Sequence, residues 1–433
     1  MLQKGLCRTA FPGRLLPRET AAHCVRTPNQ ADPSPTRTQV VRRRFLQGTA
    51  LAWAGLALGG LTEALGQPAG GRSRPAARRV PVIDVTDLYH PHQDVGDNFD
   101  LVAAYALPEI DLRAVILDVT EGYRHASAQH QDPAFRDPTG PRDPGYIPVT
   151  QLNYLFGRDV PCAAAPFGRM KSPGDKMLDA PPFQQSGVEL ILRVLRQSGE
   201  PVEILSFGSA RPVALAFNRQ PDLVRQKVRR IHLCAGASSP ECLEWNVMLD
   251  PHAMVCLLRS DLPVAIYPCA TREGPFAYGP HNGFWKLADL KFIEKMHPRL
   301  KNYLAYAFGG STRPDFLRFL DEPPHEEILK DVYGRGHNVW ETSVWAQVSG
   351  RRIVRRADGH FRLVPAGEVL PNDKVLPNEL RPCRIEVPAS GLFRFELTGR
   401  PTNFLIYDRS DPRANEQALR EALPALYQGF TLP

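Results

Sequence analysis

Short apolar runs alternate with amphipathic stretches over much of the chain. Six runs have the length and composition of buried strands, and they lie at 80–85, 114–119, 160–164, 202–207, 230–234 and 263–267. The stretches between them predict helices at 99–107, 150–156, 187–197, 212–218 and 251–259. Because such strands separated by helices form parallel sheets covered on both faces, the pattern predicts an open, mostly parallel, Rossmann-like α/β sheet.

From about residue 350 the pattern changes to short β-like pieces. They lie at 352–354, 360–364, 384–387, 393–397 and 403–407, and a last amphipathic stretch predicts a helix at 414–427. This region is expected to be a β-rich appendage rather than more of the same sheet. The predicted organisation is a leader (1–66), a linker rich in Pro, Gly and Arg (67–79), an α/β domain (80–349) and a small β-rich C-terminal extension (350–433).

Composition narrows the class of protein. The chain has 433 residues, 43% of them hydrophobic, which is enough for a real core in one large or two ordinary domains. Its formal net charge of +7 is local, because the first 66 residues hold nine Lys and Arg against three Asp and Glu. The rest of the chain is close to neutral. Charge therefore gives no support for a nucleic-acid partner.

The leader carries the features of an export signal. RRRFL at 42–46 precedes an apolar run rich in Gly and Ala at 48–61, and ALG at 64–66 supplies small residues for cleavage. The order of these parts resembles a twin-arginine signal and predicts a periplasmic protein. The alternative is a membrane anchor, but the run is shorter than the ~20 residues that a bilayer span needs. We therefore expect no membrane association after the signal is cleaved.

The first predicted strand leads into a loop that is dense in carboxylates, namely Asp84, Asp87, Asp94, Asp97 and Asp100. Together they need a counter-charge, and oxygen ligands gathered after a strand are typical of a site for a hard cation. The carboxyl end of a strand is also where open α/β sheets bind ligands. The alternatives are an acidic loop that faces solvent, with Asp as a turn former, and a transition-metal site built on HPHQD at 90–94.

Three further polar clusters carry candidate chemistry. GSARP at 208–212 follows a predicted strand as a turn in which Gly allows close backbone approach. Glu244 and Asn246 lie two apart in an extended segment, an arrangement that can hold vicinal hydroxyls, with Trp245 on the other side. A polar loop before a helix is the alternative. GHNVWE at 336–341 is expected to open an apolar helix, in which Asn338 can serve as a cap.

In this order the clusters resemble the inosine-uridine nucleoside hydrolase family over residues 80–348. The strongest similarity lies in VEILSFGSARPVALAFNRQPDLVRQKVRRIHLCAGA and ECLEWNVMLDPHAMVCLLRSDLPVAIYPCAT. The resemblance implies a sheet of the nucleoside hydrolase type that binds Ca²⁺ and ribose at its carboxyl edge. With the leader, it implies an exported hydrolase that cleaves the N-glycosidic bond of a ribonucleoside or related small ribosyl compound. Oligomers are frequent in that family, which makes a homo-oligomer an expectation here.

The resemblance also places roles on particular residues. Asp100 matches the general base that takes a proton from water, and His337 matches the acid that faces the leaving group. Glu244 and Asn246 match the pair that holds the ribose. The candidates to wall the base are Trp245, Trp340 and Tyr89.

The metal positions are the least well matched. Asp94 matches a calcium-binding Asp, but Leu101 falls where the family has a second Asp ligand. Asp97 or Asn98 is expected to substitute for it. A carbonyl ligand falls on Arg211, which brings a cation, and a late Asp ligand falls on Asn338, which adds no charge. The sequence therefore predicts Ca²⁺ bound more weakly than is usual in the family. The rival hypothesis is a non-catalytic ribose- or glycan-binding protein with a decayed metal site.

Overall fold

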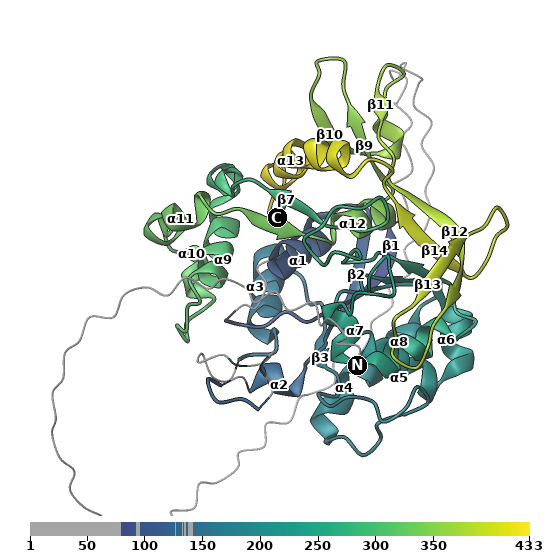
Figure 1. Ribbon diagram of the computed structural model, residues 1–433. Helices are drawn as coiled ribbons and strands as arrows, with labels where there is room; N and C mark the ends of the chain where they lie inside the picture. The colour runs from purple at the N-terminus through teal and green to yellow at the C-terminus, as the bar shows by residue number, and fades with distance from the viewer. Residues whose placement is uncertain (1–78, 92–95, 126, 132, 134–135, 137–141) are drawn as a thin grey trace, which may run out of the picture. The chain divides into compact units, whose positions relative to one another are not determined.

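The computed structural model describes residues 79–91, 96–125, 127–131, 133, 136 and 142–433. The predicted leader and all of the linker except Arg79 lie outside the described residues. The described part is built on a nine-stranded sheet in the order β13-β12-β14-β6-β5-β4-β1-β2-β3 (Figure 1). From β14 to β3 all neighbouring strands pair in parallel. This confirms the open, mostly parallel α/β sheet that the sequence predicted.

The parallel strands lie close to the predicted apolar runs. Their bounds are β1 Val80–Thr86, β2 Ile110–Leu117, β3 Cys162–Ala164, β4 Val202–Ser206, β5 Val228–Leu233, β6 Val264–Ile266 and β14 Phe404–Asp408. Successive side chains of a strand point to opposite faces of the sheet. In β1, Val82 belongs to one hydrophobic cluster, whereas Ile83 and Val85 belong to a second cluster on the other face. Continuous apolar runs are therefore needed, because both faces are buried.

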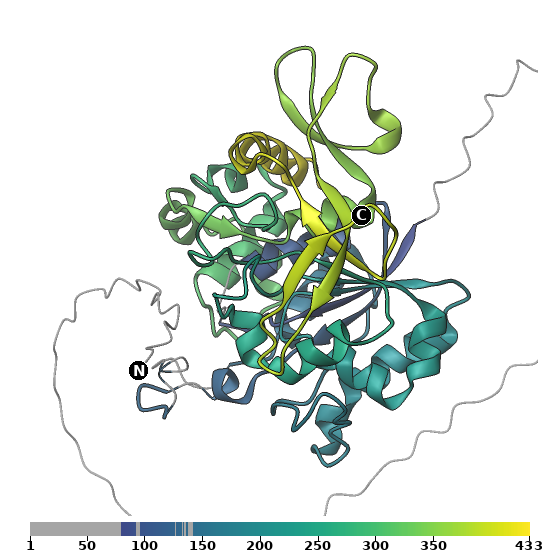
Figure 2. The same ribbon diagram turned by 45° about the vertical axis from the view of Figure 1, so that its right-hand side comes forward.

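Helices cover both faces of this sheet (Figures 1 and 2). One cluster includes residues of α4 (Pro182–Gln197), α5 (Arg211–Arg219), α6 (Pro221–Lys227) and α8 (Pro251–Leu258). The other includes residues of α1 (Gly96–Ala106), α3 (Tyr146–Phe156), α9 (Pro298–Phe308) and α12 (Thr342–Ser349). Further helices of the described chain are α2 (Glu121–Arg124), α7 (Trp245–Leu249), η2 (Lys291–Lys295), α10 (Arg318–Asp321), α11 (Glu326–Tyr333) and η3 (Ala366–Glu368).

The C-terminal region is β-rich, as the sequence predicted, but three of its strands belong to the main sheet, which the sequence did not predict. β14 pairs with β6, β12 (Glu379–Glu386) pairs with β14, and β13 (Arg394–Leu397) pairs with β12, so these strands extend the main sheet. The physical reason lies in the core, because Ile406 is fully buried and pairs with Ile266. The rest of the region matches the β-rich expectation. β9 (Arg351–Arg355), β10 (Phe361–Pro365) and β11 (Lys374–Val375) form a second sheet, and α13 (Pro412–Gln428) packs against β10.

The GHNVWE motif does not open a helix directly. His337–Val339 form strand β8, which pairs antiparallel with β7 (Trp285–Leu287), and α12 begins only at Thr342. Asn338 lies opposite Lys286 in this ladder, so it is not a helix cap. The apolar Val339 and Trp285 are buried as a pair, which favours the strand over an earlier helix start.

Within the described ranges, none of the helices is both long enough and apolar enough to cross a lipid bilayer.

Candidate functional site

An acidic cluster lies beside the carboxyl end of the central strand β1. Asp84 is in β1, Asp97 and Asp100 are in α1, and Glu341 immediately precedes α12. Burial raises the pKa of Asp100 well above its ordinary value, and the negative charges of Glu341, Asp97 and Asp84 raise it further. Burial raises the pKa of Asp84 to about 7. Three carboxyl groups therefore act on Asp100, and one of them, Glu341, is far from it in sequence.

Two oxygen atoms of this cluster are buried without a hydrogen-bond partner, Asp84 Oδ1 and Asp100 Oδ2. Such oxygens can be satisfied by protons or by a hard cation. In the part of the chain that the structure describes, no three His, Cys, Asp or Glu side chains are grouped closely enough to form a ready metal site. Asp94, the predicted calcium ligand, lies outside the described residues. The donor chemistry thus suits a hard cation, but the described ligands alone do not complete its site.

Glu244 and Asn246 lie where the chain enters α7 after β5. Glu244 caps this helix, because its Oε1 accepts a hydrogen bond from Asn246 N (3.0 Å), and its Oε2 accepts one from Gly236 N (2.7 Å). Asn246 Nδ2 donates to the carbonyl groups of Cys234 (2.9 Å) and Phe207 (3.3 Å), which follow β5 and β4. Burial raises the pKa of Glu244 to about 7, although the surrounding N–H groups act to lower it. The predicted ribose pair is therefore held at the carboxyl ends of two central strands.

Aromatic rings lie beside this pair. The ring of Trp245 meets Tyr123 edge to face with centroids 6.1 Å apart, and Tyr123 lies 5.1 Å from Tyr89. The guanidinium of Arg142 lies 4.4 Å from the centroid of Tyr123. Trp245 and Tyr89 were candidate wall residues in the sequence. Tyr123 was missed because it lies between the predicted strand at 114–119 and the predicted helix at 150–156, where the sequence predicted no element.

Arg211 belongs to a second, buried cluster. Its side chain is fully buried, with Nη2 donating to Asp118 Oδ1 (3.2 Å) and Nη1 to Asp250 Oδ2 (3.4 Å). Its Nε donates to Pro166 O (2.8 Å), and Ser209 N and Oγ also donate to Asp118. Arg211, which follows β4, therefore links the segment after β2 to the segment before α8. The sequence did not single out Asp118, although a charge directly after an apolar strand was the available signal.

His337 and Asn338 lie in β8. The His337 ring is 6.0 Å from the ring of Phe99, the residue before Asp100, so β8 lies beside the first half of α1. Glu341, the last residue of the GHNVWE motif, supplies a negative charge that raises the pKa of Asp100. Sequence reasoning missed Glu341, and the local signal for it was an acid directly before an apolar helix. The metal-ligand roles of Asn338 and of the Arg211 carbonyl stay predictions.

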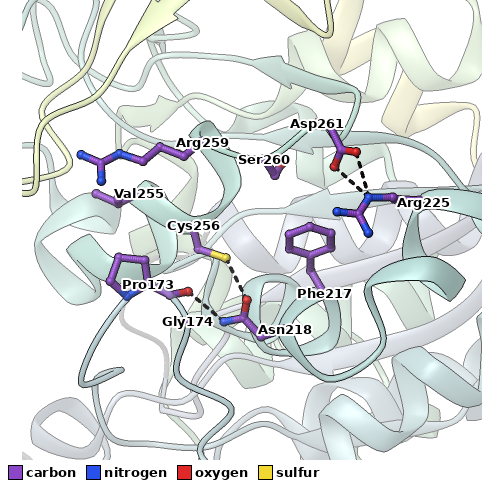
Figure 3. A pocket seen from close by; sticks show the side chains of 10 residues that line it. All are labelled: Pro173, Gly174, Phe217, Asn218, Arg225, Val255, Cys256, Arg259, Ser260 and Asp261. Atoms are coloured by element: carbon purple, nitrogen blue, oxygen red, sulfur yellow. Dashed lines mark hydrogen bonds and ion pairs between the residues drawn. The ribbon is translucent and has the colours of Figure 1, made fainter.

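A cavity of about 460 Å³ lies apart from these residues, between α5, α6 and α8 (Figure 3). None of the predicted site residues lines it. Its polar groups already have partners: Arg225 is paired with Asp261, and Asn218 donates to Pro173 O (2.8 Å) and accepts from the thiol of Cys256 (3.4 Å). The candidate site therefore stays at the sheet's carboxyl edge.

An open, doubly wound sheet with buried acids and an anchored Glu–Asn pair at its carboxyl edge belongs to the class of α/β proteins that bind ligands there. The family model of the inosine-uridine preferring nucleoside hydrolases matches residues 97–319, which is just over half of the chain. The chain belongs to this family.

The sequence identity to individual relatives is 29% or lower. The chain is 29% identical over 208 residues to the pyrimidine-specific ribonucleoside hydrolase RihA of Citrobacter koseri, which covers 43% of this chain and 59% of that protein. It is 28% identical over 191 residues to RihA of Escherichia coli, which covers 39% of this chain and 55% of that protein. The chain thus spans less than two thirds of the curated relatives it matches.

Among solved structures, a plant nucleoside hydrolase, PpNRh1, has a TM-score of 0.45 and 13% identity, with 81% of this chain and all of that chain covered. The purine-preferring ribonucleoside hydrolase of Gardnerella vaginalis has a TM-score of 0.42 and 14% identity, with 80% and 99% covered.

Proposed function

We propose that this protein hydrolyses the N-glycosidic bond of a ribonucleoside or a related small ribosyl compound. The observation that carries the proposal is that Asp100, a buried acid with a raised pKa, shares the sheet's carboxyl edge with the anchored pair Glu244 and Asn246. A carboxyl group tuned upward from its ordinary pKa is suited to accept a proton from water near neutral pH. Membership of the family supports the same reaction.

Each residue has a distinct part in this proposal. Cleavage of a glycosidic bond passes through an oxocarbenium-like transition state, so water must be activated, the sugar held and the base released. Asp100 takes the proton from the attacking water. Glu244 and Asn246 hold the ribose hydroxyls, and His337 faces the leaving group. The ring of Trp245, with those of Tyr123 and Tyr89 beside it, packs against the base.

A hard divalent cation, which we propose to be Ca²⁺, fits the oxygen donors of Asp84 and Asp97 together with Asp94. The buried, unpartnered Asp84 Oδ1 supports a cation in this place. When bound, such an ion lowers the pKa of a water molecule beside it. The Arg211 carbonyl and Asn338 remain candidate ligands within the proposal.

Calcium is expected to raise the melting temperature of the protein, because only the folded state brings the carboxylates together. Asp94→Asn should abolish this gain without lowering the stability of the metal-free protein, since a crowded acid cluster loses one charge. The matched control is Asp222→Asn, whose carboxylate is fully exposed. It should keep the wild-type response. A melting temperature indifferent to Ca²⁺, Mg²⁺, Mn²⁺ and Zn²⁺ would remove the metal from the proposal.

The deciding experiment for the function is release of free ribose from a panel of purine and pyrimidine ribonucleosides. Pyrimidine nucleosides are the first to test, since the relatives named RihA are pyrimidine-specific. Release that rises with protein concentration and time supports the hydrolase. Ribose binding by calorimetry without ribose release from any nucleoside would favour the non-catalytic binding protein.

We further propose that the protein is exported by the twin-arginine route, on the strength of RRRFL at 42–46 and the apolar run at 48–61. A fusion of residues 1–70 to a reporter should reach the periplasm. Changing Arg42 and Arg43 to Lys should leave the reporter in the cytoplasm, whereas the same change at Arg14 and Arg18 should not. Equal export of the Arg42/Arg43 variant would refute this route.

A further inference from the structure

Helix α1, which carries Asp100, is held by two tyrosine hydroxyls from distant parts of the chain. Tyr303 in α9 donates to Asn98 Oδ1 (3.0 Å), and Tyr427 in α13 donates to the main-chain carbonyl of Phe99 (2.7 Å). The acceptors belong to Asn98 and Phe99, the two residues that precede Asp100. The Tyr427 bond comes from the C-terminal helix, more than one hundred residues beyond the end of the family match at residue 319.

The ring of Tyr427 is also locked in place. It meets the ring of Phe99 at 5.5 Å and 80°, and it lies 6.2 Å from Phe292 and 5.0 Å from Phe430. Gln428 Nε2, in the same turn of α13, donates to Phe292 O (3.1 Å). These contacts fix the hydroxyl relative to α1, so the bond to Phe99 can hold the helix in one position rather than follow its motion.

Helix α13 also lines a cavity beside Asp100. A small cavity of about 10 Å³, room for roughly one water molecule, is lined by eleven residues, among them Asp100 of α1, Thr342 and Trp345 of α12, and Leu423, Leu426 and Tyr427 of α13. Three of the eleven belong to α13. Asp100 Oδ2 is buried without a hydrogen-bond partner, and the Asp100 side chain shares this cavity with three residues of α13.

We propose that Tyr427 is a positioning residue for Asp100, and that the C-terminal helix α13 thereby forms part of the catalytic centre. This inference rests on the proposed hydrolase function. The hydroxyl of Tyr427 holds the first half of α1 through the Phe99 carbonyl, and this sets the place of the Asp100 carboxylate relative to the sugar-binding pair. Small displacements of a reacting group lower turnover strongly while leaving substrate affinity nearly unchanged.

The test compares Tyr427→Phe with Tyr306→Phe. Both variants keep the ring and remove one buried hydroxyl that donates to a main-chain carbonyl, since Tyr306 donates to Arg313 O (2.8 Å) at a place outside the site. Similar losses of melting temperature are expected in the two variants. Tyr427→Phe should lower kcat roughly tenfold with KM little changed, on the scale of one well-placed hydrogen bond, and Tyr306→Phe should not.

Hydrogen exchange of the α1 amides gives a second readout that does not depend on turnover. Exchange in residues 96–106 should be faster in Tyr427→Phe than in the wild type, and unchanged in Tyr306→Phe. If the wild type releases ribose and the two variants have equal kcat, the inference is wrong although the hydrolase function stands. If the wild type releases no ribose, the proposed function fails. Unchanged α1 exchange in Tyr427→Phe would then overturn the positioning role as well.

Discussion

Asp100→Asn is expected to lower turnover by about two orders of magnitude or more, the usual scale for a general base, with little change in ribose affinity. The amide has the same size but cannot accept the proton from water. The melting temperature should not fall, because the folded state already disfavours the charged form of Asp100. Burial and the charges of Glu341, Asp97 and Asp84 all raise its pKa, so removing the charge relieves a penalty.

The control for this experiment is Glu203→Gln. Glu203 is also a buried acid, but it is the second residue of β4, away from the carboxyl edge, and it accepts a hydrogen bond from His232 (3.2 Å). Its substitution should change stability and leave turnover at the wild-type level. Near-normal ribose release by Asp100→Asn would contradict the assignment of the base, whatever happens in Glu203→Gln.

Arg211→Met is expected to lower the free energy of unfolding by about 3–5 kcal/mol, the scale for leaving buried charges without their partner. The substitution preserves most of the apolar stem. It leaves Asp118 and Asp250, which both face the guanidinium in the interior, without their cationic partner. Chemical denaturation measures the loss directly.

A triple variant separates charge from packing. Adding Asp118→Asn and Asp250→Asn to Arg211→Met removes the unpaired buried charges. The triple variant should recover a large part of the lost free energy of unfolding, because burying neutral groups costs less than burying charges without a partner. The surface comparison is Arg225→Met, whose ion pair with Asp261 is solvent-exposed and should matter by less than about 1 kcal/mol. If Arg211→Met costs no more than Arg225→Met, the buried cluster does not stabilise the fold in this way.

Hydrophobic periodicity alone was enough to predict the central layers of the fold. The runs at 80–85 and 202–207 became β1 and β4, and the helices between runs formed at the expected places. Strand and helix periods are local properties, readable over a few residues. The same is true of Glu244 and Asn246, whose spacing in a loop after a strand already predicted a shared role, and both side chains are held together at the sheet edge.

Pairing between distant segments was not readable in this way. The run at 403–407 has the pattern of any short strand, and only its packing against β6 makes it part of the main sheet. Glu341 reaches the environment of Asp100 because α12 packs against α1. Arg211 had been considered for its carbonyl, whereas its side chain forms the buried ion pairs.

The sequence by itself therefore determined the order and type of most elements, the family, and the candidate residues that lie within one loop. Tertiary structure decided which acids share an electrostatic environment, which cation neutralises Asp118 and Asp250, and that Tyr427 contacts the helix bearing Asp100. The physical reason is the separation along the chain over which each kind of information acts. Local periodicity reports burial of a face, but the partner across that face is chosen by packing of the whole chain.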